Sequence, residues 1–275
     1  MSNAQFGNNR LFGLSSDDPV AVYSIDPATG AANEVLSLNG TSSIVGLSFV
    51  TGTPFGTDLQ DFPGAGPNYS VGSFAPNGVI TFLNDQEDSS NWWGLASDDC
   101  DRRVLYSVDN DSDPDYFLKE QLLDGTIRTI GATGVDAAGM AFDDENGILY
   151  ALEDGGEDGG VLYTISIEDG TAQLIGPTGM PDDSIDLGLA YDELNRVLFG
   201  IAGNSGELYT LNVNTGMASL VGPIGVDVVI DGLAWLDDCP LVRPIPTLSE
   251  WGLIAMAGVL GIIGLLAIRR RKVTA

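Results

Sequence analysis

The chain has 275 residues, 44% of them hydrophobic, so it is long enough and apolar enough to bury a substantial core. Its 39 acidic and 11 basic residues give a formal net charge of -28 at pH 7, and a field of that sign repels phosphates, which excludes nucleic acid as a partner. The absence of histidine excludes Ser-His-Asp and Cys-His catalysis and histidine metal sites.

The first nine residues, MSNAQFGNN, form a polar N-terminal extension (1–9). They contain neither the charged segment nor the apolar segment of a signal peptide. Because the opposite end of the chain has features of an exported protein, we expect that the N-terminus is truncated or processed.

A repeated unit accounts for residues 10–238, and its clearest copy is 188–225. Four short apolar runs, rich in β-branched and aromatic residues and separated by Gly, Asn and Asp turns, predict a small antiparallel sheet. A turn glycine follows the third run of each unit: Gly30, Gly78, Gly125, Gly170 and Gly216. A second glycine marks the first run: Gly46, Gly94, Gly139, Gly188 and Gly232. Both series have five members at intervals of 44 to 49 residues, which predicts five units.

The two ends of the repeat complement one another. The first unit lacks its first run, whereas Gly232–Leu236 is a first run with no others after it. An open solenoid would need polar caps, but pairing the last strand with the first unit closes a ring and protects the sheet edges. We therefore predict a closed ring of four-stranded antiparallel sheets.

Residues 22–30 (VYSIDPATG) and the segment that begins LYTI at 162 resemble the LYxIDxxTG repeat of β-propeller proteins. The resemblance implies an all-β, five-bladed β-propeller closed by the C-terminal strand, and it implies little about activity because propellers host many functions. The unit at 45–92 departs most from the repeat. TGTPFGTDLQDFPGAGPNYS stands there in place of a clear second strand, and we expect the third and fourth strands at 69–74 and 79–83.

The composition changes after Leu236. A stiff Pro-rich linker (239–246) precedes eighteen uncharged residues (251–268), which as a helix would span about 27 Å at about 1.5 Å per residue. We predict one C-terminal transmembrane helix. Four cations follow it and predict a cytoplasmic C-terminus: Arg269, Arg270, Arg271 and Lys272.

The segment 245–275 combines the literal motif IPTLSEWG, an apolar stretch and an arginine cluster. This arrangement resembles the IPTL-CTERM sorting signal of Gram-negative bacteria. The resemblance implies recognition by an exosortase-type membrane transpeptidase, cleavage near the motif, and transfer to the cell surface or an extracellular polysaccharide matrix. The motif residues are Ile245, Pro246, Thr247, Leu248, Ser249, Glu250, Trp251 and Gly252.

Aspartates alternate after the second run of the third unit, at the spacing of calcium-loop ligands: Asp109, Asp111, Asp113 and Asp115. Glu120 occupies the twelfth position, where an EF-hand has its bidentate ligand. Pro114 replaces the glycine of the sharp turn, and strands flank the loop, which argues against an EF-hand. The segment is therefore either a solvated acidic loop or a calcium site, and no other cofactor is expected.

Asp136, Asp186 and Asp231 each precede an inner-strand glycine by one to three residues, so we expect them to ring one mouth of the central channel. Paired carboxylates at such a mouth are suited to glycosidase chemistry. Aspartates repeated between blades also act as turn caps. Both interpretations stay open from the sequence.

Strand order assigns the remaining charges to faces. The second-to-third turns and the connections between blades carry acids without Lys or Arg, whereas the arginines and Lys119 map to the opposite face, which we expect to be of mixed charge. Cys100 and Cys239 follow corresponding first strands, and export permits a disulfide between them if they are within reach across the ring.

Together these features predict an exported protein, held as a precursor in the inner membrane of a Gram-negative bacterium and then displayed at the cell surface or in the extracellular matrix. Its propeller is expected to act as a non-enzymatic binding or scaffolding module for a polysaccharide or a surface protein. The alternative is a secreted carbohydrate-active enzyme that uses the channel-mouth aspartates.

Overall fold

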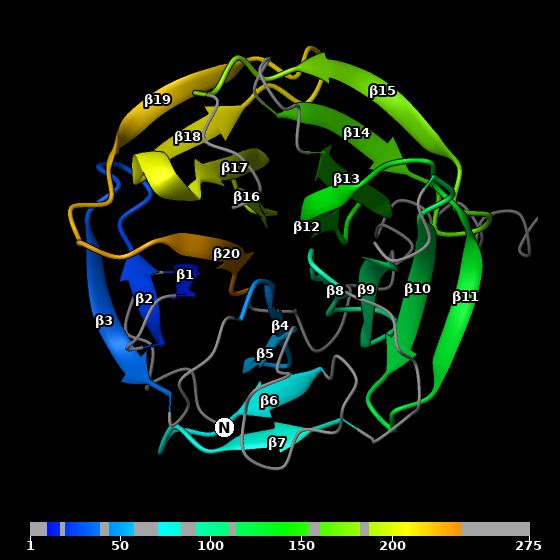
Figure 1. Ribbon diagram of the computed structural model, residues 1–275, viewed down its shortest axis with the longest axis horizontal. Helices are drawn as coiled ribbons and strands as arrows, with labels where there is room; N and C mark the ends of the chain where they lie inside the picture. The colour runs from blue at the N-terminus through cyan, green and yellow to red at the C-terminus, as the bar shows by residue number, and fades with distance from the viewer. Residues whose placement is uncertain are drawn as a thin grey trace, which may run out of the picture. The chain divides into compact units, whose positions relative to one another are not determined.

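The computed structural model describes residues 10–16, 20–38, 44–57, 71–83, 92–109, 114–153, 160–181 and 187–237. The chain divides into two compact units, Met1–Cys239 and Pro240–Ala275, and all described residues lie in the first. Within that unit, five four-stranded antiparallel sheets stand like blades around a central axis (Figure 1). The predicted all-β, five-bladed propeller is confirmed.

Each blade runs from an inner strand at the axis to an outer strand at the rim. Blade 1 consists of β20 (Ile230–Trp235), β1 (Leu11–Ser15), β2 (Ala21–Ile25) and β3 (Ala32–Ser37). Blade 2 consists of β4 (Leu47–Val50), β5 (Thr53–Gly56), β6 (Gly72–Phe74) and β7 (Ile80–Phe82). Blade 3 consists of β8 (Ala96–Asp98), β9 (Val104–Asp109), β10 (Phe117–Leu122) and β11 (Ile127–Ala132). Blade 4 consists of β12 (Ala137–Asp143), β13 (Ile148–Glu153), β14 (Val161–Ile165) and β15 (Ala172–Pro177), and blade 5 of β16 (Leu187–Asp192), β17 (Val197–Ala202), β18 (Glu207–Leu211) and β19 (Ala218–Pro223).

The ring closes as predicted, by pairing the last strand with the first. β20 is antiparallel to β1, with Leu11 opposite Trp235 and Gly13 opposite Leu233. The Leu236 amide donates to the carbonyl oxygen of Arg10 at 2.7 Å, which extends the ladder by one bond. The edge of β1 that would otherwise lie open is thereby covered.

Both glycine series have a structural reason. The five turn glycines all have positive φ, between 77° and 90°, which a residue with a Cβ seldom adopts. The inner-strand glycines allow neighbouring inner strands to approach closely around the axis. A Cβ on Gly139 would lie 2.8 Å from the carbonyl oxygen of Leu187, and one on Gly188 would lie 2.8 Å from the amide nitrogen of Leu233. The sequence period therefore marks backbone constraints that every blade shares.

Blade 2 corrects one expectation. A second strand is present within the divergent segment, because Thr53–Gly56 (β5) pairs directly with β4. Thr51 and Gly52 both have positive φ and form the tight turn that joins the two strands. The third and fourth strands are β6 and β7, each three residues long.

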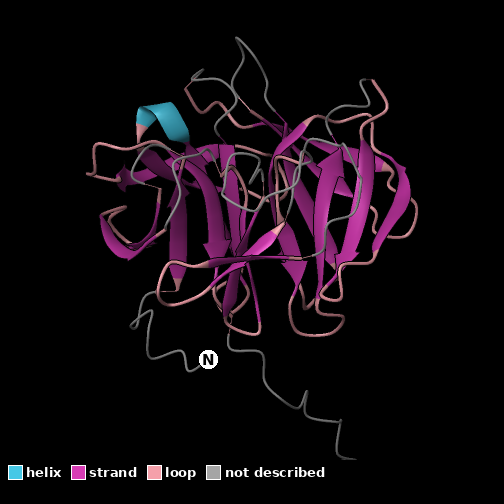
Figure 2. Ribbon diagram, turned by 60° about the horizontal axis from the view of Figure 1, so that its bottom comes forward, coloured by secondary structure: helices cyan, strands magenta, loops and turns pink. Residues whose placement is uncertain are grey.

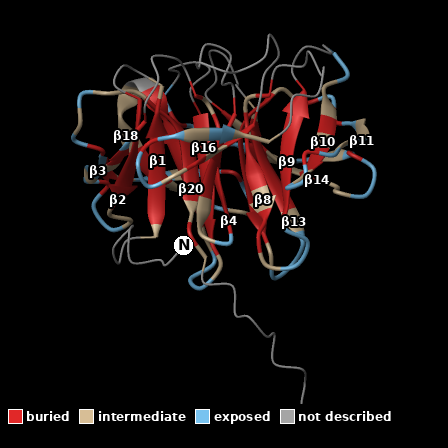
Figure 3. Ribbon diagram, turned by 90° about the horizontal axis from the view of Figure 1, so that it is seen from below, coloured by how far each residue is buried: buried red, intermediate tan, exposed pale blue. Residues whose placement is uncertain are grey.

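The core lies between the blades, where inner and second strands are buried (Figure 3). Among the described residues, aromatic pairs cross four seams and join the second strand of one blade to the inner strand of the next. They are Phe12–Phe49, Tyr106–Phe142, Tyr150–Tyr191 and Phe199–Trp235, with ring centroids 5.2, 5.6, 5.7 and 5.9 Å apart. In the seam between blades 2 and 3, the inner strand carries Ser97 instead, whose hydroxyl donates to the carbonyl oxygen of Phe49 at 2.7 Å.

Strands dominate the described part of the chain, where the short 3-10 helix η4 (Gly203–Ser205) joins β17 to β18 (Figure 2). No helix within these residues is long and apolar enough to cross a membrane. The predicted transmembrane helix at 251–268 lies outside the described residues.

Candidate functional site

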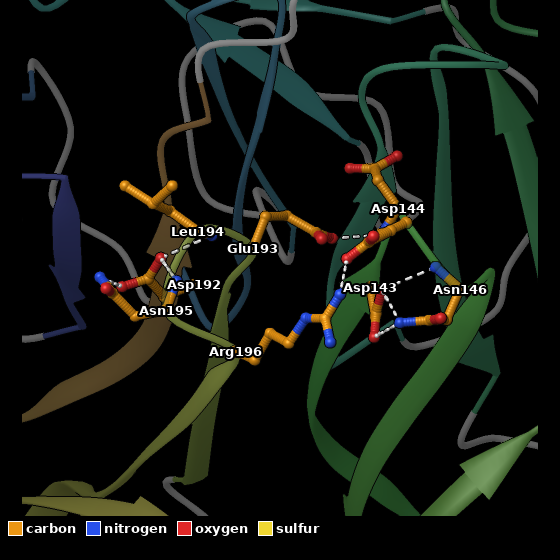
Figure 4. A network of polar contacts seen from close by, with 9 residues as sticks. Asp143, Asp144, Asn146, Asp192, Glu193, Leu194, Asn195 and Arg196 are labelled. Atoms are coloured by element: carbon orange, nitrogen blue, oxygen red, sulfur yellow. Dashed lines mark hydrogen bonds and ion pairs between the residues drawn. The ribbon is translucent and has the colours of Figure 1, made fainter. Parts of the chain in front are cut away.

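Three inner strands end in acidic turns in which the first aspartate caps the turn. Asp143 Oδ1 accepts the amide of Asn146 at 2.8 Å, and Asp192 Oδ1 accepts the amide of Asn195 at 3.1 Å (Figure 4). Asp98 Oδ1 accepts the amide of Asp101 at 3.0 Å in the same manner. These side chains replace missing backbone partners at the turn, so their role is structural.

The second acid of each turn reaches across a seam to the preceding blade. The amide of Thr51 in blade 2 donates to Asp99 Oδ1 in blade 3. The amide of Cys100 in blade 3 donates to Asp144 Oδ1 in blade 4, at 3.3 Å. The amide of Asp144 donates in turn to Glu193 Oε1 in blade 5 (Figure 4). Three successive seams therefore share one kind of hydrogen bond at the same end of the channel.

Blade 1 contributes a fourth acid at the corresponding position, whereas blade 2 has Thr51 there. We call the four acids the channel-mouth ring: Asp99, Asp144, Glu193 and Asp237. Each lies five residues after an inner-strand glycine. The acids predicted above to bind a ligand precede the inner strands and belong to the other mouth of the channel.

The channel-mouth ring borders a small cavity. Its volume is about 30 Å³, and Asp99, Asp144 and Asp237 lie in its wall together with residues of all five inner strands. A space of this size holds about two water molecules. The channel beyond it is filled by one apolar side chain per blade: Leu47, Leu95, Met140, Leu189 and Leu233. The channel is therefore a packed core with a small cavity at one end, not an open passage.

Burial and mutual repulsion raise the pKa values of the channel-mouth ring. Burial, with the neighbouring Glu193, raises the pKa of Asp237 to about 8, and burial beside Asp143 raises the pKa of Glu193 to about 7. The pKa of Asp144 is raised well above its usual range by burial and by Asp98. Burial also raises the pKa of Asp99, although the amide of Thr51 and the charge of Arg103 oppose the shift. Near neutral pH Asp144 and Asp237 therefore hold protons that solvated carboxylates would have lost.

The opposite mouth of the channel has less room. Asp231 is buried and borders a cavity of about 10 Å³ that is lined by the inner-strand glycines and their apolar neighbours. Asp136 is half-buried, and Asp186 lies outside the described residues. Neither cavity accommodates a sugar ring, so glycosidase chemistry by these aspartates would have to take place outside the channel. The enzyme alternative stays a prediction.

The described residues add no further ligand to the predicted calcium loop at 109–115. Asp109 is buried with its Oδ2 3.5 Å from Lys119 Nζ, so it already has a cation, and Asp115 is exposed. Asp111 and Asp113 lie outside the described residues. Throughout the described ranges, no group of three or more acids or cysteines is placed to hold a metal ion. Lys119 therefore lies beside an acid of the face that we expected to lack cations.

Cys100 lies in the turn after β8 and is disulfide-bonded. Cys239 lies outside the described residues, so its pairing with Cys100 stays a prediction. We expect the intact protein, purified without reductant, to be lighter than the reduced protein by two hydrogen atoms and to resist thiol alkylation. Alkylation of both cysteines without reduction would contradict the pairing.

Comparison with known proteins supports the predicted sorting motif at the C-terminus and the propeller fold of the preceding residues. Residues 243–271 match the IPTL-CTERM motif. Among solved structures 392 chains match, so the fold is widespread, and one match is a chain of the crystal structure of a nidogen/laminin complex. That chain has a TM-score of 0.55 and 15% sequence identity, and the match covers 82% of this chain and 97% of that chain, which shows the fold alone. No curated protein matches the sequence.

Proposed function

We propose that this chain is the precursor of an exported protein, because it joins a five-bladed propeller to an IPTL-CTERM motif. In this proposal 251–268 crosses the inner membrane of a Gram-negative bacterium as a helix, and an exosortase-type transpeptidase cleaves near 245–252. The propeller then reaches the cell surface or the extracellular matrix. The observation that carries the proposal is the motif match over 243–271.

At its destination the propeller acts as a non-enzymatic binding or scaffolding module. The packed channel supports this role, because cavities of about 30 and 10 Å³ have room for water molecules and not for an organic substrate. A partner such as a polysaccharide or a surface protein would instead be recognised on the loops at the two faces, which a rigid ring holds in place. The strong negative charge disfavours acidic partners.

Deletion of residues 245–252 tests the sorting proposal. The wild-type chain is expected to be shortened and released from the inner membrane in a host that supplies the transpeptidase, whereas the deletion variant stays at precursor length in the membrane fraction. The measurement is immunoblotting of fractionated cells.

A variant that lacks only residues 273–275 is the matched control, since it also shortens the tail but keeps the motif, the apolar segment and the four cations. It should be processed like the wild type. Processing and release of the 245–252 deletion at the wild-type rate would contradict the proposal.

A further inference from the structure

The channel-mouth ring brings four carboxyls to one end of the channel from blades that are far apart in the sequence. Asp99 is buried, and the other three are half-buried. A cavity with room for only about two water molecules offers little solvation for ionised oxygens. The free energy of the folded state therefore depends on how many carboxyls of the channel-mouth ring are ionised.

The groups that face the ring are mostly acidic. Asp99 faces Asp98 and Arg103, and Asp144 faces Asp98 and Glu193. Glu193 faces Asp143 and Glu145. Asp237 faces Glu193, Asp99, Asp192 and Arg10. The nearby phenols stay neutral because their own pKa values are raised: Tyr106, Tyr150 and Tyr191. Two arginines thus oppose a larger number of carboxylates.

The seam at the closing strand differs from its neighbours. Backbone amides support Asp99, Asp144 and Glu193 across the seams between blades 2 and 5. Asp237, directly after β20, accepts no such hydrogen bond from the residues that the structure describes, and it faces Glu193 of blade 5. At Asp237 the repulsion from ionised Glu193 is opposed by the charge of Arg10 and not by a hydrogen bond across the seam from the described residues, unlike at the other three acids.

We propose that the channel-mouth ring makes closure of the propeller sensitive to pH: protonated carboxyls let the five blades close tightly, and ionised carboxyls loosen β20 from blade 5. The same strand leads into the C-terminal tail, so the region of the ring that loosens is the one from which the chain leaves the propeller.

The direction follows from proton linkage. A carboxyl with a raised folded-state pKa binds a proton more tightly in the folded chain than in the unfolded chain. Its stabilising contribution is complete below the unfolded pKa, about 4, and is lost as the pH rises through the folded pKa. For Glu193 and Asp237 that loss extends to about pH 7 and about pH 8.

Thermal unfolding of the full-length chain in a non-ionic detergent, followed by tryptophan fluorescence from about pH 5 to about pH 9, tests the proposal. The wild-type Tm is expected to fall by about 5 °C or more over this range. The variants Asp144→Asn and Asp237→Asn keep the shape of the side chain but lack the charge. In each variant the Tm should decrease over this pH range by only about half as much as in the wild type, and at pH 8 each variant should have a higher Tm than the wild type.

Asp124→Asn and Asp169→Asn are matched controls, since each removes one negative charge from an exposed turn whose aspartate has a lowered pKa. They should follow the wild-type curve. High salt screens exposed charges but not buried ones, so the fall should persist in about 1 M NaCl. The proposal is wrong if the control variants flatten the curve as much as the ring variants, or if salt abolishes it.

A second measurement needs no variant. If the ring holds protons in the folded state, unfolding at pH 7 releases them, and the calorimetric enthalpy of unfolding changes with the ionisation enthalpy of the buffer. Proton uptake, or no dependence on the buffer, would overturn the proposal.

Discussion

Replacing Gly139 by alanine is expected to lower the free energy of unfolding by about 3 kcal/mol, a Tm decrease of about 6–12 °C. The new Cβ would lie 2.8 Å from the carbonyl oxygen of Leu187 and 3.1 Å from the amide nitrogen of Leu189. Both atoms belong to the backbone of the next inner strand, which cannot shift without disturbing the whole ring. Chemical denaturation of the purified variant measures the loss.

Gly200 is the matched control. A Cβ on Gly200 would approach Leu211 Cδ1 to 2.7 Å, a similar distance, but that atom ends a side chain that can rotate. Gly200→Ala should therefore cost about 1 kcal/mol or less. Equal losses at the two positions would show that close backbone approach around the channel is not what requires Gly139.

Removing the closing strand is expected to abolish cooperative folding of the propeller. A chain of residues 10–225 lacks β20, whose Ile230 and Leu233 are buried, and the buried Leu236 that follows it. These three side chains alone contribute about 6 kcal/mol, comparable to the whole stability of a typical domain. β1 would also be left with an open edge. Circular dichroism and thermal melting of fragments 10–237 and 10–225 measure the difference.

A circular permutant separates the loss of residues from the loss of closure. It begins with residues 226–237 and continues, through a linker of about four residues like the turn at 144–147, into residues 10–225. The amide of Leu236 already contacts the carbonyl oxygen of Arg10, so the linker spans a short gap. The permutant should melt cooperatively, as fragment 10–237 does. A stable fragment 10–225 would contradict the role given to β20.

Much of the fold could be predicted because local constraints recur in the sequence. The turn glycines at Gly30 and Gly216 have positive φ, and the inner-strand glycines at Gly139 and Gly188 have no room for a Cβ. Such positions accept few other residues, so their spacing is visible without any knowledge of the packing. The second strand of blade 2 was missed because the αL conformation of Thr51 departs from the turn chemistry of the other blades.

The sites were less predictable. Asp136 and Asp231 were assigned to a channel mouth from their place before inner strands, and the structure gives Asp231 a cavity of only about 10 Å³. The acids five residues after the inner-strand glycines are hard to recognise, because a D-D or D-E pair after a strand is typical of a solvated turn. In blades 3, 4 and 5 the first acid of the pair is such a turn cap, and the second is not.

The number of blades, the closure by the last strand and the IPTL motif follow from the sequence alone, since each depends on residues near one another in the chain or on complementary ends. The meeting of Asp99, Asp144, Glu193 and Asp237 depends on the ring. Their positions are 44 to 49 residues apart in the chain, and only the stacking of five blades brings them to one end of the channel, where shared burial changes their pKa values. Burial and charge proximity are properties of the assembled ring, and no single repeat contains them.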